Sequence, residues 1–247
     1  MISPDRHNAD VTRVQIRYSN NPSKNPFDLV AEFHERFWLC TVLASPRPMF
    51  LPWEQPQIKL RLKLTEEEIE ETIKCMQDND RLHTADNLAD ILYIACGNLL
   101  SLGFAWPNMW ADAATFWGNP LTRNGLEFLE SDKIFFEPMA TNLRACGMKA
   151  AKAAADNDRA GYYTATLELI SAVTSTAVVL GIPLNDVFYV VHISNMRKLG
   201  LDGKPIYRED GKVIKPDTWS EEVVNEDIAY ILTTDRQSEG ARRFSWS

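Results

Sequence analysis

Two acidic segments carry the residues whose type and spacing best suit chemistry, TEEEIEE at 65–71 and TADNLAD at 84–90. Successive residues of a helix are separated by about 100°. Three acids of the first segment therefore fall within one arc of about 100° beside an apolar stripe, namely Glu67, Glu68 and Glu71. In the second segment Asp86 and Asp90 share a helix face, although Asp90 has apolar neighbours. A carboxylate in such surroundings is costly unless another charge compensates it.

A helical hairpin would bring the two acidic faces together, because only the turn QDNDR and a few residues separate them. Oxygen-only ligand sets suit Mg²⁺ or Mn²⁺, which usually keep several waters and also bind substrate phosphates. We therefore predict a metal site where these carboxylates converge. The alternative is a solvated face for the glutamate run and an exposed position near a helix start for Asp86. Asp90 fits that alternative poorly.

The elements that must position these acids are helices. Apolar residues at helical spacing predict helices at 27–38, 58–77, 82–102, 122–131, 136–155, 159–180 and 220–232, with shorter ones within 104–120 and 181–200. Four prolines predict a loop at 44–57, and two Asp-Gly pairs predict a small hairpin or ordered loop at 201–219. The sequence therefore indicates an all-α fold.

A repeat divides the chain. DNDR occurs at 78–81 and again at 156–159, and the same offset aligns Asp90 with Glu168 and Gly103 with Gly181. We predict an old duplication, with a first helical unit at 1–120 and a second at 121–247 that together form one compact pseudo-dimer. The second unit has lost the acids, because RACGMK stands at the position of EEEIEE.

Two longer matches point to a family. LRLKLTEEEIEETIKCM (60–76) with TADNLADILYIACG (84–97) resembles the all-α NTP pyrophosphohydrolases, a superfamily that includes the MazG proteins, phosphoribosyl-ATP pyrophosphohydrolase and the dimeric dUTPases. The similarity is to the MazG-like branch of bacteria and phages. VHISNMRKLGLDGKPIYREDGKVIKPDTW (191–219) resembles the C-terminal signature of that branch.

The resemblance implies a Mg²⁺-dependent enzyme, with Mn²⁺ as a substitute, that splits a nucleoside triphosphate into monophosphate and pyrophosphate. In this reading Glu68 and Glu71 match ExxE and Asp90 matches the last acid of ExxD. Asn87 stands where the glutamate of that motif is expected, and Asp86 is its replacement; which of the two binds the metal stays open.

The resemblance also assigns roles at the other end of the substrate. Glu67 or Glu68 would orient or deprotonate the attacking water. The expected substrate-binding residues are Asn87, Asn195, Lys198, Lys204, Arg208, Lys212 and Lys215. Surface charge is the plain alternative for any single lysine. The second unit would thus supply the phosphate-binding end of one composite site whose metal end lies in the first unit.

The composition limits the classes of molecule that the protein is expected to bind. A net charge of −8 and a pI of about 5.1 argue against a nucleic-acid binder. We expect no membrane span, no signal peptide and a cytoplasmic location, that of the host if a phage encodes the protein. The resemblance further implies a homodimer of pseudo-dimers that controls or sanitises a nucleotide pool, with dUTP, dCTP and dGTP among the candidate substrates. The alternative is a catalytically inactive nucleotide sensor or interaction scaffold.

Overall fold

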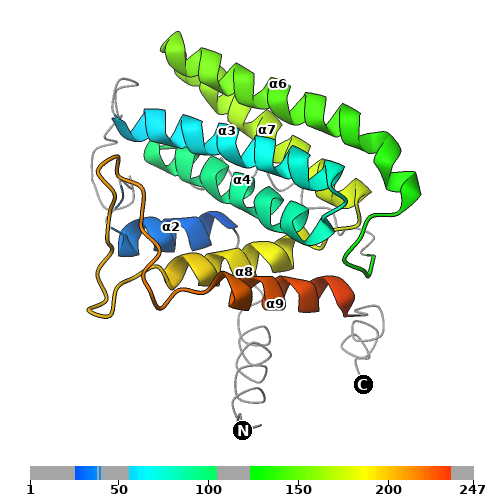
Figure 1. Cartoon of the computed structure of the whole chain (residues 1–247). Helices are drawn as coiled ribbons and strands as arrows, with labels where there is room; N and C mark the ends of the chain where they lie inside the picture. Colours follow the sequence, from blue (N-terminus) through cyan, green and yellow to red (C-terminus); the bar gives the residue numbers. More distant parts are fainter. Residues whose placement is uncertain (1–25, 38, 40–55, 105–122, 235–247) are drawn as a thin grey trace, which may run out of the picture.

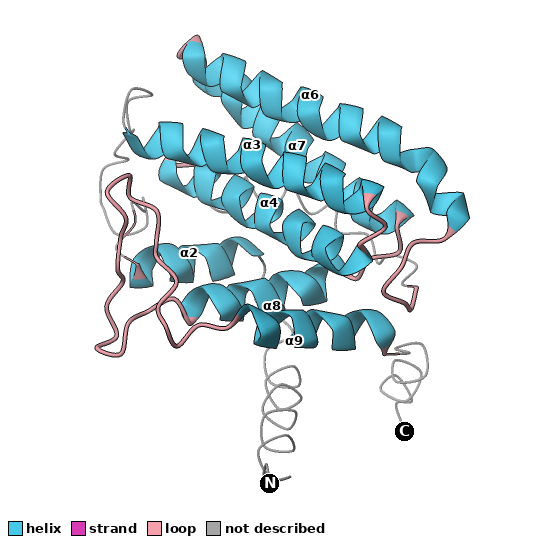
Figure 2. Ribbon diagram, in the orientation of Figure 1, coloured by secondary structure: helices cyan, strands magenta, loops and turns pink. Residues whose placement is uncertain are grey.

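The described part of the chain is helical. The computed structural model describes residues 26–37, 39, 56–104 and 123–234. Its helices are α2 Pro26–Arg36, α3 Pro56–Gln77, α4 Arg81–Ser101, the 3₁₀ helix η3 Glu130–Phe135, α6 Phe136–Ala155, α7 Arg159–Val179, α8 Leu184–Met196 and α9 Glu221–Thr233. Only isolated bridges, and no strands, join the described residues elsewhere. The predicted all-α fold is confirmed (Figure 2).

Two helical hairpins form one layer of the molecule. The α3–α4 hairpin lies beside the α6–α7 hairpin, with α3 packed on α6 and α4 packed on α7 (Figure 1). Helices α2, α8 and α9 pack against α4 from the other side. Helix α4 is therefore central, and its Leu88, Leu92 and Leu99 are fully buried. Each such leucine contributes about 1.5–3 kcal/mol to stability through burial.

Both hairpin turns use the same chemistry. Asn79 has φ 61° and Asn157 has φ 55°, the left-handed region that asparagine tolerates better than most residues. The next residue caps the following helix in each case. The Asp80 carboxylate accepts a hydrogen bond from the His83 backbone N–H, and that of Asp158 accepts one from Gly161. The repeated DNDR thus ends one helix and begins the next.

The repeat has further structural counterparts. The bounds of α4 and α7 differ by the sequence offset, since 159 − 81 and 179 − 101 both equal 78. The Arg81 side chain donates to the backbone oxygen of Gly181 at 2.8 Å, and Arg159 donates to that of Leu102 at 2.8 Å. Because the offset aligns Gly181 with Gly103, these two contacts correspond to within one residue, as expected for an approximately two-fold interface. These correspondences support the duplication and its two units, which stay a prediction.

The helix predicted at 122–131 is wrong. Residues 123–129 form no helix, and η3 begins only at Glu130. The backbone N–H of Arg123 donates to Gly181 and that of Gly125 to Leu232, so these groups bond to other elements instead of to a local helix. Gly125 also has φ 132°, a conformation that is not helical. The short helix predicted within 104–120 lies almost wholly outside the described residues.

The segment between α8 and α9 makes two tight turns. Antiparallel bridges join Leu199 to Pro205 and Tyr207 to Val213. This ordered loop, which agrees with the prediction, rises past α2 toward the beginning of α3 (orange in Figure 1). The Tyr207 hydroxyl donates to the backbone oxygen of Phe37 at the end of α2. The signature loop, residues 197–220, is thereby fixed against the first half of the chain.

No single helix in the described ranges has both the length and the hydropathy to cross a membrane. Helices α7 and α8 meet that criterion only when taken together, and the chain bends by 118° between them.

Candidate functional site

A pocket of about 550 Å³ brings the two predicted ends of the site together. Glu68 from α3 and Asp90 from α4 line it, and both come from the acidic segments. Asn195 from α8 and two lysines of the signature loop, Lys198 and Lys212, line the same pocket. Acids from the first half of the chain therefore meet an amide and cations from the second half.

The carboxylates near this pocket repel one another. Burial raises the pKa of Glu68 to about 8, and the charges of Asp90, Glu71 and Asp86 add to the rise. Burial followed by the charge of Asp90 raises the pKa of Asp86 to about 7. Burial also raises the pKa of Asp90. Glu68, Asp86 and Asp90 thus lie in surroundings that disfavour their charged forms, and Glu71 is close enough for its charge to affect Glu68 and Asp90.

Three lysines partly compensate this charge. Lys198 and Lys215 oppose the rise in the pKa of Asp90, and Lys212 opposes that of Glu68. Lys198 is itself surrounded by protein, and burial lowers its pKa. Its Nζ donates to Asn195 Oδ1 at 2.6 Å, which fixes the ammonium beside the pocket. This end of the pocket can bind phosphate oxygens through charge-assisted hydrogen bonds.

The donor set fits a divalent metal ion in its chemistry. All four acids offer oxygen ligands. Burial disfavours the charged forms of Glu68, Asp86 and Asp90, and a cation beside them would stabilise those forms. No three acidic, histidine or cysteine side chains of the described residues already stand in the arrangement of a metal centre.

Other predicted residues lie outside the pocket lining. Glu67 forms an ion pair with Lys63 at 3.4 Å on the solvent side of α3. The Asn87 amide contacts Cys75 Sγ at 3.6 Å between α3 and α4, so the structure gives its assignment to substrate no support. Glu71 is exposed on α3, and Asp86 is half-buried one turn from Asp90.

The remaining basic residues of the signature loop differ in position. Lys204 and Arg208 are exposed, and Arg208 forms a two-point ion pair with Asp210. Lys215 lies over the ring of Trp219, with Nζ 3.8 Å from its centroid. Trp219 in turn donates from Nε1 to Ser194 Oγ at 3.0 Å. Lys215 is therefore oriented near the aspartates, whereas nothing brings Lys204 or Arg208 into the pocket.

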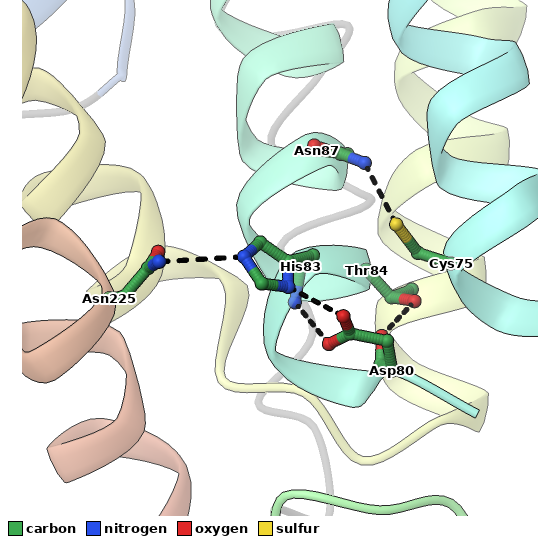
Figure 3. A network of polar contacts seen from close by, with 6 residues as sticks. All are labelled: Cys75, Asp80, His83, Thr84, Asn87 and Asn225. Carbon is green, nitrogen blue, oxygen red and sulfur yellow. Dashed lines mark hydrogen bonds and ion pairs between the residues drawn. The ribbon is translucent and has the colours of Figure 1, made fainter. Parts of the chain in front are cut away.

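A polar network fixes the first turn of α4 (Figure 3). Asp86 follows in the second turn of the same helix. Asp80 Oδ2 contacts His83 Nδ1 at 2.6 Å, and the amide of Asn225 on α9 contacts His83 Nε2 at 3.5 Å. Thr84 Oγ1 donates to the Asp80 backbone oxygen at 2.7 Å. A positive charge on His83 lowers the pKa of Asp86 and so favours the charged carboxylate. The network thus connects α9 to the acidic face.

Several pocket residues are not among those predicted. Arg61, His34, Ser101 and Tyr207 line the same cavity. Tyr93, which shares the face of Asp90, also lines it, and its hydroxyl lies 3.2 Å from His192 Nδ1. The sequence signal for these residues is weak. The one signal is Gly97, which shares a helix face with Asp90. It has no side chain, and Arg61 and His34 lie where its Cβ would be.

Comparison with known proteins finds a family model that matches the part of the chain with the acidic half of the site. Residues 30–114 match the model of the phosphoribosyl-ATP pyrophosphohydrolase family, one of the MazG-like all-α NTP pyrophosphohydrolases. The resemblance is therefore confirmed over this stretch, which contains α3, α4 and all four acids. The match indicates a pyrophosphohydrolase. Helix α8 and the signature loop lie beyond it. Neither the curated proteins nor the solved structures contain a match to this chain.

Proposed function

We propose that this protein is a metal-dependent pyrophosphohydrolase that converts a nucleoside triphosphate and water into a nucleoside monophosphate and pyrophosphate. One observation carries the proposal: Glu68 and Asp90 line the same pocket as Asn195, Lys198 and Lys212. This combination offers both a site for a cation and a site for phosphates. The match to the phosphoribosyl-ATP pyrophosphohydrolase family supports the reaction class.

Glu68, Glu71, Asp86 and Asp90 are the residues that would hold Mg²⁺ or Mn²⁺. When bound, such an ion neutralises the triphosphate and lowers the pKa of water in its coordination shell. Of the two residues left open by the sequence, Asp86 is favoured over Asn87 as a ligand. The charge of Asp90 acts on Asp86, whereas the Asn87 amide contacts Cys75.

The chain's own groups account for the rest of the reaction. Water attacks the α-phosphorus, the bond from that atom to the α–β bridging oxygen breaks, and pyrophosphate leaves. Glu68 accepts the proton of the water, and it is favoured over Glu67 because it lines the pocket. Lys198 and Lys212 bind the charge that develops on the leaving pyrophosphate, with Lys198 positioned by Asn195.

In this proposal the site is the composite one expected from the repeat, and its metal end would lie on α3 and α4 and its phosphate end on α8 and the signature loop. The candidate substrates are dUTP, dCTP and dGTP, as expected from the sequence, together with phosphoribosyl-ATP, which the family match adds. The corresponding role is the control or sanitation of a nucleotide pool, in a host cell or during phage infection. Association into a homodimer remains part of the proposal.

The decisive experiment is a turnover assay. The protein is incubated with Mg²⁺ or Mn²⁺ and a panel of ribo- and deoxynucleoside triphosphates, and the products are separated by ion-exchange chromatography. Monophosphate and pyrophosphate are expected from at least one substrate. Asp90→Asn should lower kcat/KM at least about a hundredfold, because a carboxylate ligand is lost.

Glu66→Gln is the matched control, because this exposed glutamate lies on α3 away from the pocket lining. It should retain the activity of the unaltered protein. Metal-dependent nucleotide binding with no pyrophosphate release from any substrate would contradict the proposal and indicate the inactive nucleotide sensor.

A further inference from the structure

The pocket continues well past the acids along the groove between α3 and α4. Arg61 lies seven residues before Glu68 on α3, and Gly97 lies seven residues after Asp90 on the antiparallel α4. Seven residues are two helical turns, so this second level lies about 10 Å from the first. That span is comparable with the distance from the phosphates to the base of an extended nucleotide.

Three helices fix the polar groups of this distal level. Arg61 Nη2 lies 3.2 Å from His34 Nε2, and Arg61 Nη1 donates to Asn98 Oδ1 at 3.5 Å. Because a guanidinium only donates, His34 Nε2 is the acceptor in this contact. The missing side chain at Gly97 makes this possible. A Cβ there would lie 2.8 Å from both Arg61 Nη1 and His34 Nε2.

An independent observation indicates that a ligand binds at this level. Ser101 lines the pocket one turn beyond Gly97, and only 1% of its surface is exposed. Among the described residues its Oγ has no hydrogen-bond partner. A buried hydroxyl without a partner is costly, and a bound molecule that offers it a hydrogen bond removes that cost. Apolar and aromatic side chains, Leu64, Ile94 and Tyr93, lie between this level and the acids and provide a surface for a flat ring.

We propose that Arg61 and Ser101 bind the edge of the substrate's nucleobase and select bases with a keto oxygen at that edge over bases with an amino group. This inference rests on the proposed function. Arg61 only donates hydrogen bonds, so it binds the carbonyl oxygen of guanine, hypoxanthine or uracil. The amino group of adenine or cytosine at the same position would face a cation that offers no acceptor, which is an unfavourable contact.

The test uses substrate pairs that differ in this group alone, ITP against ATP and dUTP against dCTP. The protein with its metal should prefer the keto member of a pair by at least about tenfold in kcat/KM, as expected for a hydrogen bond to a charged group. Arg61→Gln should bring the ratio close to one, since an amide both donates and accepts. Ser101→Ala should lower kcat/KM for the keto substrate several-fold.

Two controls separate base recognition from folding and from the phosphate site. Lys59→Gln changes an exposed residue of α3 and should leave the ratio unchanged. Binding of IMP against AMP, measured by calorimetry, gives the same comparison without turnover. If Arg61→Gln does not fold, Ser101→Ala and the two substrate pairs still decide the question.

Equal rates within both pairs would overturn the inference while leaving the proposed function intact. Loss of phosphoribosyl-ATP turnover in Arg61→Gln with an unchanged ITP-to-ATP ratio would also overturn it, because Arg61 would then bind the distal phosphate of that substrate. Absence of all turnover would instead contradict the proposed function itself.

Discussion

Asp86 and Asp90 lie in the most buried helix of the described structure, and their environment raises the pKa of each. Such groups destabilise the fold when they are charged, so a function must account for their presence. The nearby lysines reduce this cost, and a bound divalent cation would reduce it further. These residues therefore make the stability of the protein sensitive to both pH and metal.

The metal-free protein should become less stable as the pH rises from about 5 to about 8. Glu68 and Asp86 have ordinary pKa values of 4.5 and 3.8, raised to about 8 and about 7 in the fold. Between these limits the native state binds more protons than the unfolded chain, so each increase in pH favours unfolding. Below the ordinary pKa values these carboxyl groups are protonated in both the native and the unfolded state, so they no longer make stability depend on pH. Melting temperatures measured by calorimetry across this range should fall by several degrees.

Mg²⁺ should restore the melting temperature at pH 8 and have little effect at pH 5, where protons compete for the ligands. In Asp86→Asn the pH slope should be shallower. A melting temperature that rises from pH 5 to pH 8 without metal would contradict this account of the acids.

The sequence predicted a residue's place in the site where its type was unusual among its neighbours or where it belonged to a known signature. Asp90 stands out because its neighbours are apolar, and Asn195, Lys198 and Lys212 belong to a recognisable signature. Arg61, His34 and Ser101 could not be found in this way. Their relation depends on three helices meeting at Gly97, and no spacing along the chain encodes that meeting.

The signature loop contains two Asp-Gly turns, which have similar backbone geometry but lie at different distances from the pocket. Gly203 has φ 75° and Gly211 has φ 89°, so alanine is strained at either position. A Cβ at Gly203 would have no heavy atom within 4 Å, whereas one at Gly211 would lie 3.9 Å from Leu60. Only the Gly211 turn presents a lysine, Lys212, to the pocket.

Gly203→Ala and Gly211→Ala should each cost about 1 kcal/mol of stability. Only Gly211→Ala should raise KM for the nucleotide, by about threefold to tenfold, because the strained turn displaces Lys212. Steady-state kinetics with a melting curve for each variant would check this. Equal increases in KM for both variants would mean that the loop acts as a whole and not through Lys212.

Helices with long, regular apolar stripes were predicted to within two residues of their observed ends, as α3, α4, α6 and α7 show. The segment at 122–131 misled because its apolar side chains are spaced as in a helix while its backbone groups bond to Gly181 and Leu232. Those partners lie far along the chain, so a local pattern cannot show them.

For the whole molecule, the pocket exists only because distant halves of the chain meet. Lys198→Met tests this dependence. It removes the ammonium from the half that has no acidic cluster and keeps the length of the side chain. kcat/KM should fall about a hundredfold, while metal binding, measured by titration, should be retained because the acids remain.

Lys149→Met is the control for Lys198→Met, because Lys149 is an exposed residue of the same half that pairs with Glu168 at 2.6 Å. It should keep full activity. Unchanged turnover in Lys198→Met would show that the phosphate end of the site lies elsewhere.

The reciprocal arginine contacts should contribute unequally to stability. Arg81 is 2% exposed and donates to the backbone oxygens of Gly125, Arg123 and Gly181. Arg81→Ala would leave these acceptors buried without their donor and should cost about 4 kcal/mol. Arg159 is less buried, and Arg159→Ala should cost about 1–2 kcal/mol. The two melting temperatures should fall by about 10 °C and about 4 °C respectively, and equal losses would contradict this reading of the interface.

The partners in this arginine pair are main-chain oxygens, which every amino acid supplies. These contacts therefore place no demand on the charge or polarity of the side chains at the acceptor positions. Two halves joined in this way can accumulate different substitutions without losing their mutual orientation. Under the predicted duplication, one half would then be free to retain its acidic residues while the other replaced them, with the orientation of the two halves kept.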